Sequence, residues 1–245
     1  EVSTEGWWNG RGWIKPFNHT FEEKRFLDGN LGPNTGSMGS VVTVARSPDR
    51  LVRGTVKRLE SFLKQTAYRG PVDINCIVTK DSLYALELTA RLGYDAIEAL
   101  AEGLLEPLAD VLFETAAGVK KEMDIESLPM SAVRVSVPPW PHAAPSASEI
   151  GRPLVGLNRG NLKHVYLTDV FKDGDDYKFA GGDGVVYKAT ANGRSFRESR
   201  RRVYRTIGNI GLLDAQYRTD IGERVDPDLP HGSKDWARLK DWGWI

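Results

Sequence analysis

Apolar residues along the first part of the chain follow a strand-like pattern. Residues 1–17 are rich in Val, Trp and Ile, and they are interrupted by Asn9, Gly10 and Gly12, which favour turns with positive φ. We therefore predict a β-hairpin here. Residues 28–40 are rich in glycine and contain a proline, so we expect a structured loop there rather than a helix or a strand.

Helical spacing of apolar residues occurs in two segments. Ser47 supplies an N-cap before a first-turn proline, and the pattern that follows predicts one amphipathic helix over about 48–66. A second helical stretch covers about 95–117 and is interrupted near Gly103 and Pro107.

The rest of the chain is dominated by β-rich runs. Residues 72–78 and 83–88 are separated by a turn-forming run, which predicts an antiparallel pair. Prolines crowd residues 138–160 and predict a long loop and a change of sheet. Ser195 and Glu198 form a capping box that begins a helix reaching about residue 210. Further strands are predicted at 131–137, 164–171, 177–180 and 184–190.

These elements predict an α+β fold of two units followed by a tail. The first unit, an antiparallel sheet with helices, covers residues 1–125, and a smaller β-rich unit covers residues 126–232. The tail, residues 233–245, contains three tryptophans, which present more aromatic area than is comfortable in water.

Composition limits the classes of function. The 245 residues include 33 Lys and Arg against 33 Asp and Glu, so a dedicated nucleic-acid or anionic-membrane binder is disfavoured, and any anion must be bound by local charges. The single cysteine, Cys76, excludes an internal disulfide and a cysteine-rich metal site. The chain has no apolar run near the 18 or so residues of a membrane helix. We expect a cytoplasmic protein without a membrane partner.

The glycine-rich run 32–39 is the strongest candidate for chemistry. Glycines let consecutive backbone N–H groups face one anion, and Lys24 and Arg25 would add positive charge beside them. The run has neither the Walker A pattern nor the Rossmann fingerprint. A tight surface turn explains the same residues equally well.

A second candidate lies at the end of the β-run 83–88. Residues two apart on a strand share a face, so Glu87 and Thr89 can present two oxygens to one Mg²⁺, and Arg91 continues the row as an anion partner. A solvated strand face is the commoner arrangement for such residues. The arginine-rich helix at 194–205 is in turn typical of a solvated helix face, because Glu198 interrupts its charges.

Several runs in one order resemble a known enzyme family. Residues 21–25 (Phe-Glu-Glu-Lys-Arg) and 32–39 (Gly-Pro-Asn-Thr-Gly-Ser-Met-Gly) are similar to the signature of phosphoribosylamine–glycine ligases, which belong to the ATP-grasp superfamily. Residues 78–81 and 86–93 resemble that family's Leu-Thr-Lys-Asp and Leu-Glu-Phe-Asn-x-Arg-Phe-Gly stretches. Residues 217–222 (Tyr-Arg-Thr-Asp-Ile-Gly) resemble its closing motif.

The resemblance implies the C-terminal part of an ATP-grasp domain followed by the family's C-terminal domain. It implies ATP- and Mg²⁺-dependent (or Mn²⁺-dependent) ligation of glycine to 5-phosphoribosylamine in purine synthesis, through an acyl phosphate. The residues it implies are Lys24, Arg25 and Arg91 as catalytic groups, Asn34, Thr35, Gly36, Met38 and Gly39 as substrate or phosphate contacts, and Glu87 and Thr89 as metal ligands.

Three departures from the family pattern affect the transfer of activity. Thr89 replaces the family's asparagine, and a hydroxyl binds Mg²⁺ less strongly than an amide oxygen. Gly-Tyr-Asp-Ala at 93–96 replaces Gly-Asp-Pro-Glu, and Glu22-Glu23 replaces Asp-His. The resemblance also begins after the family's N-terminal domain, nucleotide lid and adenine-binding strand.

Two alternatives stay open at this point. The chain can be part of a diverged ligase for another amino acid or amine, which the changes at Thr89 and Tyr94 favour. It can instead be a non-catalytic subunit or interaction module whose tail tryptophans meet a partner chain. The partners expected are small-molecule substrates and a missing N-terminal half or a partner chain.

Overall fold

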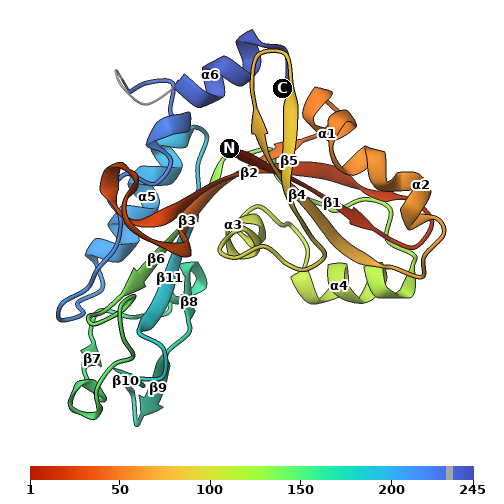
Figure 1. Cartoon of the computed structure of the whole chain (residues 1–245). Coiled ribbons are helices and arrows are strands. Elements are labelled where there is room, and N and C mark those ends of the chain that lie inside the picture. Colours follow the sequence, from red (N-terminus) through yellow and green to blue (C-terminus); the bar gives the residue numbers. More distant parts are fainter. Residues whose placement is uncertain (230–233) are drawn as a thin grey trace.

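The computed structural model describes residues 1–229 and 234–245, and one large antiparallel sheet organises them. Its strand order is β5-β4-β1-β2-β3-β6-β11-β8, and a small sheet, β7-β10-β9, lies beyond one end (Figure 1). The strands are β1 (Val2–Trp8), β2 (Trp13–Leu27), β3 (Leu31–Ala45), β4 (Gly70–Val78), β5 (Leu83–Thr89), β6 (Met130–Ser136), β7 (Pro153–Leu154), β8 (Val165–Leu167), β9 (Val170–Asp173), β10 (Asp176–Phe179) and β11 (Val185–Asn192).

Helices cover both faces of the large sheet (Figure 1). They are α1 (Arg50–Gly54), α2 (Glu60–Leu63), α3 (Ala96–Ala101), α4 (Leu108–Ala117), α5 (Phe196–Gly208) and α6 (Lys234–Asp241). On one face, α3 and α4 bury Trp7 and Val42 in an apolar cluster. On the other face, α1, α5 and α6 share a larger cluster with Val2 and Phe21. None of the helices in the described residues has both the length and the apolar character needed to span a membrane.

Much of the predicted secondary structure is confirmed, and so is the α+β class. The first hairpin is β1 and β2, and the antiparallel pair is β4 and β5. The interrupted helical stretch becomes α3 and α4. Helix α5 begins where the capping box predicts, because the Ser195 hydroxyl accepts from the Glu198 N–H; the Glu198 carboxylate accepts from Arg194 rather than from Ser195.

The predicted loop at 28–40 is wrong. Residues 31–45 form strand β3, which pairs with β2, and a 3-10 turn at Asp28–Asn30 joins the two. Gly32 and Gly36 adopt φ of 76° and 85°, and the pairing of β2 with β3 shifts register between Glu23 and Leu27. The glycines therefore let an irregular strand pair continue where the composition suggested that pairing would stop.

The single helix predicted over 48–66 is also wrong. Thr55 has φ −115° and ψ −104°, and it separates α1 from a 3-10 turn at Val56–Leu59 and from α2. The N-cap is Asp49, whose carboxylate accepts from the Val52 N–H at 2.9 Å, rather than Ser47.

The predicted strand at 164–171 is divided between β8 of the large sheet and β9 of the small one.

The large sheet runs across the predicted boundary at residue 125. Strand β6, from the second predicted unit, pairs with β3 of the first, from Val133 opposite Gly39 to Met130 opposite Val42. The division into units stays a prediction, and its second boundary, between residues 232 and 233, lies outside the described residues.

The tryptophan-rich tail folds back onto its own chain. The Trp244 indole N–H donates to the Thr79 carbonyl at 2.8 Å, and the Trp244 ring, 4% exposed, lies 3.7 Å below the guanidinium of Arg50. Trp236 makes edge-to-face contacts with Phe21 and Phe196. The tail therefore buries its aromatic area against the sheet and α5.

We predict that Trp244→Ala lowers the free energy of unfolding by about 3 kcal/mol, because it removes a buried indole and its hydrogen bond. Urea denaturation measures this loss. The matched control is Phe113→Ala, since that ring is 75% exposed and its loss should change stability by less than about 0.5 kcal/mol. Equal stability of the two variants would contradict the docked tail.

Candidate functional site

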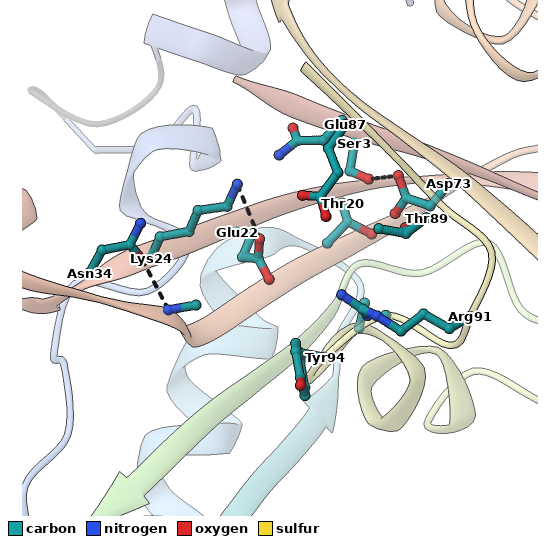
Figure 2. Close-up of a pocket in the computed structure, with 14 residues that line it drawn as sticks. Ser3, Thr20, Glu22, Lys24, Asn34, Asp73, Glu87, Thr89, Arg91 and Tyr94 are labelled. Atoms are coloured by element: carbon teal, nitrogen blue, oxygen red, sulfur yellow. Dashed lines mark hydrogen bonds and ion pairs between the residues drawn. The ribbon is translucent and has the colours of Figure 1, made fainter. Parts of the chain in front are cut away.

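A polar cavity of about 240 Å³ lies on the face of the sheet that also carries α3, beside the N-terminal end of that helix. Figure 2 shows side chains from the sheet and from the segment after β5 around it. Its lining residues are Ser3, Thr20, Glu22, Lys24, Asn34, Gly36, Asp73, Asn75, Glu87, Thr89, Arg91, Gly93, Tyr94 and Ala96.

Strand alternation explains why polar side chains gather at this point. On β2, Thr20, Glu22 and Lys24 occupy every second position and share the cavity face, because successive side chains of a strand point to opposite faces. The residues between them include Phe21, which is buried in the core of the opposite face. One strand therefore supplies the apolar core on one side and the site on the other.

Strands β4 and β5 add the acidic part of the cavity through their register. Asp73 lies opposite Thr89, and Asn75 lies opposite Glu87, so two polar pairs stand side by side on the same face. The hydroxyl of Ser3, on β1, donates to the Asp73 carboxylate. Residues 73, 87 and 89 thus present oxygens to one region.

Two positively charged side chains, Lys24 and Arg91, line the cavity. Lys24 Nζ lies 2.5 Å from Glu1 Oε1 and 3.8 Å from Glu22 Oε2. Arg91 Nη1 donates to the Leu92 carbonyl at 2.9 Å, and the guanidinium lies 4.7 Å from the centre of the Tyr94 ring. The cavity therefore places two cations around a group of carboxylates.

Burial disfavours the charged forms of two carboxylates in the cavity, those of Glu22 and Asp73. It raises the pKa of Glu22 to about 7, although the charge of Lys24 acts in the opposite direction. It raises the pKa of Asp73 to about 6, against the hydrogen bond from Ser3 and the charge of Arg91, while the charge of Glu87 adds to the rise. Additional positive charge in the cavity would favour ionisation of both groups.

The structure brings six of the ten sequence-predicted residues together in the cavity. Their roles stay predictions, but their positions agree with a common site. These residues are Lys24, Asn34, Gly36, Glu87, Thr89 and Arg91.

The other four predicted residues lie outside the cavity lining. Arg25 is exposed, and its Nη1 donates to the Gly32 carbonyl. The Thr35 hydroxyl donates to the Lys24 carbonyl at 3.1 Å and so joins the two arms of the hairpin. Met38 is buried in the core, and a Cβ on Gly39 would lie 2.5 Å from the Ala132 carbonyl oxygen. Gly39 therefore permits close packing of β3 on β6.

Sequence reasoning missed several lining residues, above all Asp73 and Glu22. The available signal was a polar residue at every second position in otherwise apolar strands, as in Thr20, Glu22 and Lys24 or in Asp73 and Asn75. Such alternation indicates a strand with one polar face. It does not show that β2 and β4, which are far apart in the sequence, lie on either side of β1 in the same sheet.

The donor set fits a hard divalent cation. Carboxylate and hydroxyl oxygens of Asp73, Glu87 and Thr89 are ligands that Mg²⁺ accepts. Within residues 1–229 and 234–245, no cluster of three or more His, Cys, Asp or Glu side chains is placed to hold an ion alone. A cation here would need oxygens from a ligand such as a phosphate, which is a common arrangement for Mg²⁺.

Comparison by sequence and comparison by structure both find phosphoribosylamine–glycine ligases. The chain is 30% identical over 222 residues to the phosphoribosylamine–glycine ligase of Streptomyces coelicolor. The aligned region covers 86% of this chain and 53% of the relative. Its fold is similar to the solved phosphoribosylamine–glycine ligase of Thermotoga maritima, with a TM-score of 0.69 and 25% identity over 90% of this chain and 55% of the other. No protein-family model matches.

A more distant structure supports the fold alone. The phosphoribosylglycinamide synthetase of Anaerococcus prevotii is 12% identical, with a TM-score of 0.56 over 86% of this chain and 52% of the other. The chain spans about half the length of the curated relatives it matches.

Glu5, on the same face as Ser3, generates a prediction about pH. Burial raises the pKa of Glu5 to about 8, the charge of Asp73 adds to the rise, and the Trp7 indole N–H opposes it. Because this pKa lies above the ordinary value of 4.5, the folded state binds the proton more tightly, and stability falls as the pH rises from about 4.5 to about 8.

We predict that Glu5→Gln stabilises the protein by about 1–3 kcal/mol at pH 8 and has little effect at pH 5. The amide keeps an oxygen for the Trp7 indole, which donates to Glu5 at 2.8 Å. Chemical denaturation at both pH values measures the difference. Glu60→Gln is the control, because a hydrogen bond from Lys64 lowers the pKa of Glu60; a gain that is the same at pH 5 and pH 8 would contradict the account of Glu5.

Proposed function

We propose, from the homology of this chain to phosphoribosylamine–glycine ligases, that it is the C-terminal part of an ATP- and Mg²⁺-dependent carbon–nitrogen ligase. The reaction proposed is the joining of glycine to 5-phosphoribosylamine in purine synthesis, through an acyl phosphate. We also propose residues 1–125 as part of the ATP-grasp domain and residues 126–232 as the C-terminal domain.

One observation supports this proposal most strongly. The cavity combines cations at its rim, Lys24 and Arg91, with the oxygens of Asp73, Glu87 and Thr89. Phosphoryl transfer depends on neutralising phosphate charge and on positioning the reactants. A mixed cavity of this kind would serve both needs, because its cations would bind phosphate oxygens and its carboxylates would bind the metal.

Each residue then has a defined task. Lys24 and Arg91 bind oxygens of a phosphate or of the substrate carboxylate, and Asn34 with the backbone at Gly36 orients that group from the hairpin side. Glu87, Thr89 and Asp73 supply oxygens to Mg²⁺, which when bound neutralises charge on the transferred phosphoryl group. The desolvated walls that raise the pKa of Glu22 and Asp73 also strengthen these charge interactions.

The N-terminal part of the relatives would supply the remainder of the nucleotide site. The chain covers only 53% of the Streptomyces coelicolor ligase, so we propose that adenine binding depends on residues outside this sequence. The alternative of a tail that meets a partner chain has less support, because Trp236 and Trp244 pack against the chain itself.

A ligase for a different amino acid or amine is the second candidate. The observation that favours it is the position of Tyr94, whose ring lines the cavity beside Arg91 and is 57% exposed. An aromatic surface at this point would contact a substrate side chain larger than that of glycine. ADP release measured across a panel of amino acids distinguishes the two candidates, and strict glycine dependence would exclude the second.

We predict that Glu87→Gln lowers the rate of ADP release at least about 100-fold, because it removes a charged metal ligand from the transition state. The assay contains this chain, the N-terminal part of a phosphoribosylamine–glycine ligase, ATP, Mg²⁺, glycine and freshly made phosphoribosylamine. Glu122→Gln, an exposed carboxylate away from the cavity, should keep the unmodified rate. Unchanged turnover in the Glu87 variant would contradict its proposed role.

We also predict that Thr89→Asn lowers the Mg²⁺ concentration needed for half-maximal activity by about threefold or more, because an amide oxygen is a better ligand than a hydroxyl. A Mn²⁺ titration followed by electron paramagnetic resonance gives the same comparison without turnover. Unchanged Mn²⁺ binding by the variant would contradict the role of Thr89 as a metal ligand.

A further inference from the structure

The motif at residues 217–222 has no place in the cavity, yet it contains one of the most deeply buried charges in the protein. Arg218 is 2% exposed. A guanidinium removed from water needs partners for its N–H groups, because an unpaired buried charge costs several kcal/mol. The positions of these partners show what the motif does.

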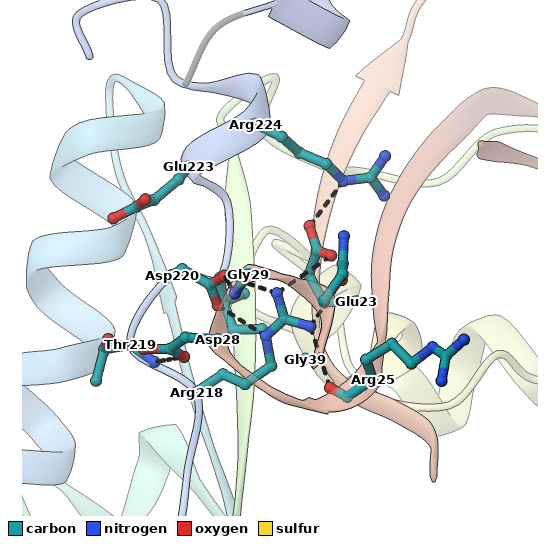
Figure 3. A network of polar contacts seen from close by, with 12 residues as sticks. Glu23, Arg25, Asp28, Gly29, Gly39, Arg218, Thr219, Asp220, Glu223 and Arg224 are labelled. Atoms are coloured by element: carbon teal, nitrogen blue, oxygen red, sulfur yellow. Dashed lines mark hydrogen bonds and ion pairs between the residues drawn. The ribbon is translucent and has the colours of Figure 1, made fainter. Parts of the chain in front are cut away.

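Arg218 connects the motif to the β2–β3 hairpin (Figure 3). Its Nε and Nη2 donate to the two carboxylate oxygens of Asp220, each at 2.7 Å. Its Nη1 donates to the Arg25 carbonyl at 3.0 Å and to Asn30 Oδ1 at 2.9 Å, and Nη2 lies 3.5 Å from Glu23 Oε2. One side chain therefore holds the hairpin at three residues.

The residues beside Arg218 hold the tip of the same hairpin. The Gly29 N–H donates to Asp220 at 2.8 Å. The Thr219 N–H donates to the Asp28 carboxylate at 2.8 Å, and the Thr219 hydroxyl donates to the same group. We call Arg218, Thr219 and Asp220 the clamp.

The clamp acts on the segment that reaches the cavity. The hairpin carries Lys24 on one arm and Asn34 on the other, and both line the cavity. Its outer part buries little apolar surface, since Leu27 is 48% exposed and Leu31 is 64% exposed. Polar contacts with the clamp, together with the edge-to-face contact of Phe26 with Trp140, therefore fix the position of this part of the hairpin.

We infer that Arg218 is a positioning residue, which holds the β2–β3 hairpin so that Lys24 and Asn34 face the ligand of the cavity. The clamp follows from contacts in the structure, and its effect on substrates rests on the proposed function. Lysine cannot replace Arg218 fully, because it lacks the planar fork that binds Asp220 while reaching the hairpin.

Amide hydrogen exchange of the whole chain tests the clamp without any ligand. In Arg218→Gln we expect exchange over residues 24–36 to accelerate about tenfold or more, while β4 and β11 keep their protection. Arg218→Lys should give an intermediate rate. The matched control is Arg152→Gln, because Arg152 pairs with Glu149 and Asp214, away from both the hairpin and the clamp. Unchanged exchange of the hairpin in a folded Arg218→Gln protein overturns the inference.

Asn30→Gly provides a milder variant if Arg218→Gln does not fold. Asn30 has φ 59°, which glycine adopts without strain, so the substitution removes the side-chain acceptor of Arg218 and keeps the turn. We expect hairpin exchange to accelerate about threefold in this variant. A rate equal to that of the unmodified protein overturns the inference.

Kinetics separate positioning from a purely structural role. In the ligase assay described above, we expect Arg218→Lys and Asn30→Gly to raise KM for phosphoribosylamine or ATP about fivefold or more, with kcat changed less than about twofold. Accelerated exchange with an unchanged KM overturns the positioning role. Absence of turnover in the unmodified protein counts against the proposed function, and the exchange result still decides whether the clamp holds the hairpin.

Discussion

The two-faced alternation of the central strands is the constraint on which the rest of the structure depends. Phe21 lies in the core of one face while its neighbours Thr20 and Glu22 line the cavity on the other. A register slip of one residue would exchange these faces, burying charge in the core and exposing aromatic rings. Apolar packing of one face therefore determines which polar groups meet on the other. The strands that form the core also position the residues of the site.

Sequence patterns predicted correctly those features that depend on residues close together in the chain. The capping residue Ser195 and the alternation of Glu87 and Thr89 depend on neighbours within a few positions, and the structure places both as expected. Asp73 was missed because its relation to Thr89 depends on the register of β4 with β5. The glycines of residues 28–40 suggested a loop because glycine is typical of loops. The sequence alone does not show that residues 218–220 form hydrogen bonds with the β2–β3 hairpin.

The cavity gathers two cations in a protein whose formal net charge is zero. Lys24 and Arg91 stand beside carboxylates whose ionisation burial disfavours, so the local balance of charge differs from that of the whole chain. A cation bound with a phosphate ligand would restore the ionised state of these carboxylates. Under the proposed function, protonation of these carboxylates and the binding of a metal and an anion would be linked at one place.

The clamp has a consequence for the order of events during synthesis on the ribosome. Arg218 and the Arg25 carbonyl that accepts from it are separated by 193 positions in the sequence. At about 5–20 residues per second, roughly 10–40 seconds pass between the synthesis of the hairpin and the synthesis of its partner. During that interval the paired arms have no clamp, so Lys24 and Asn34 are not yet held in position. The site is therefore completed only when the C-terminal part of the chain has been made.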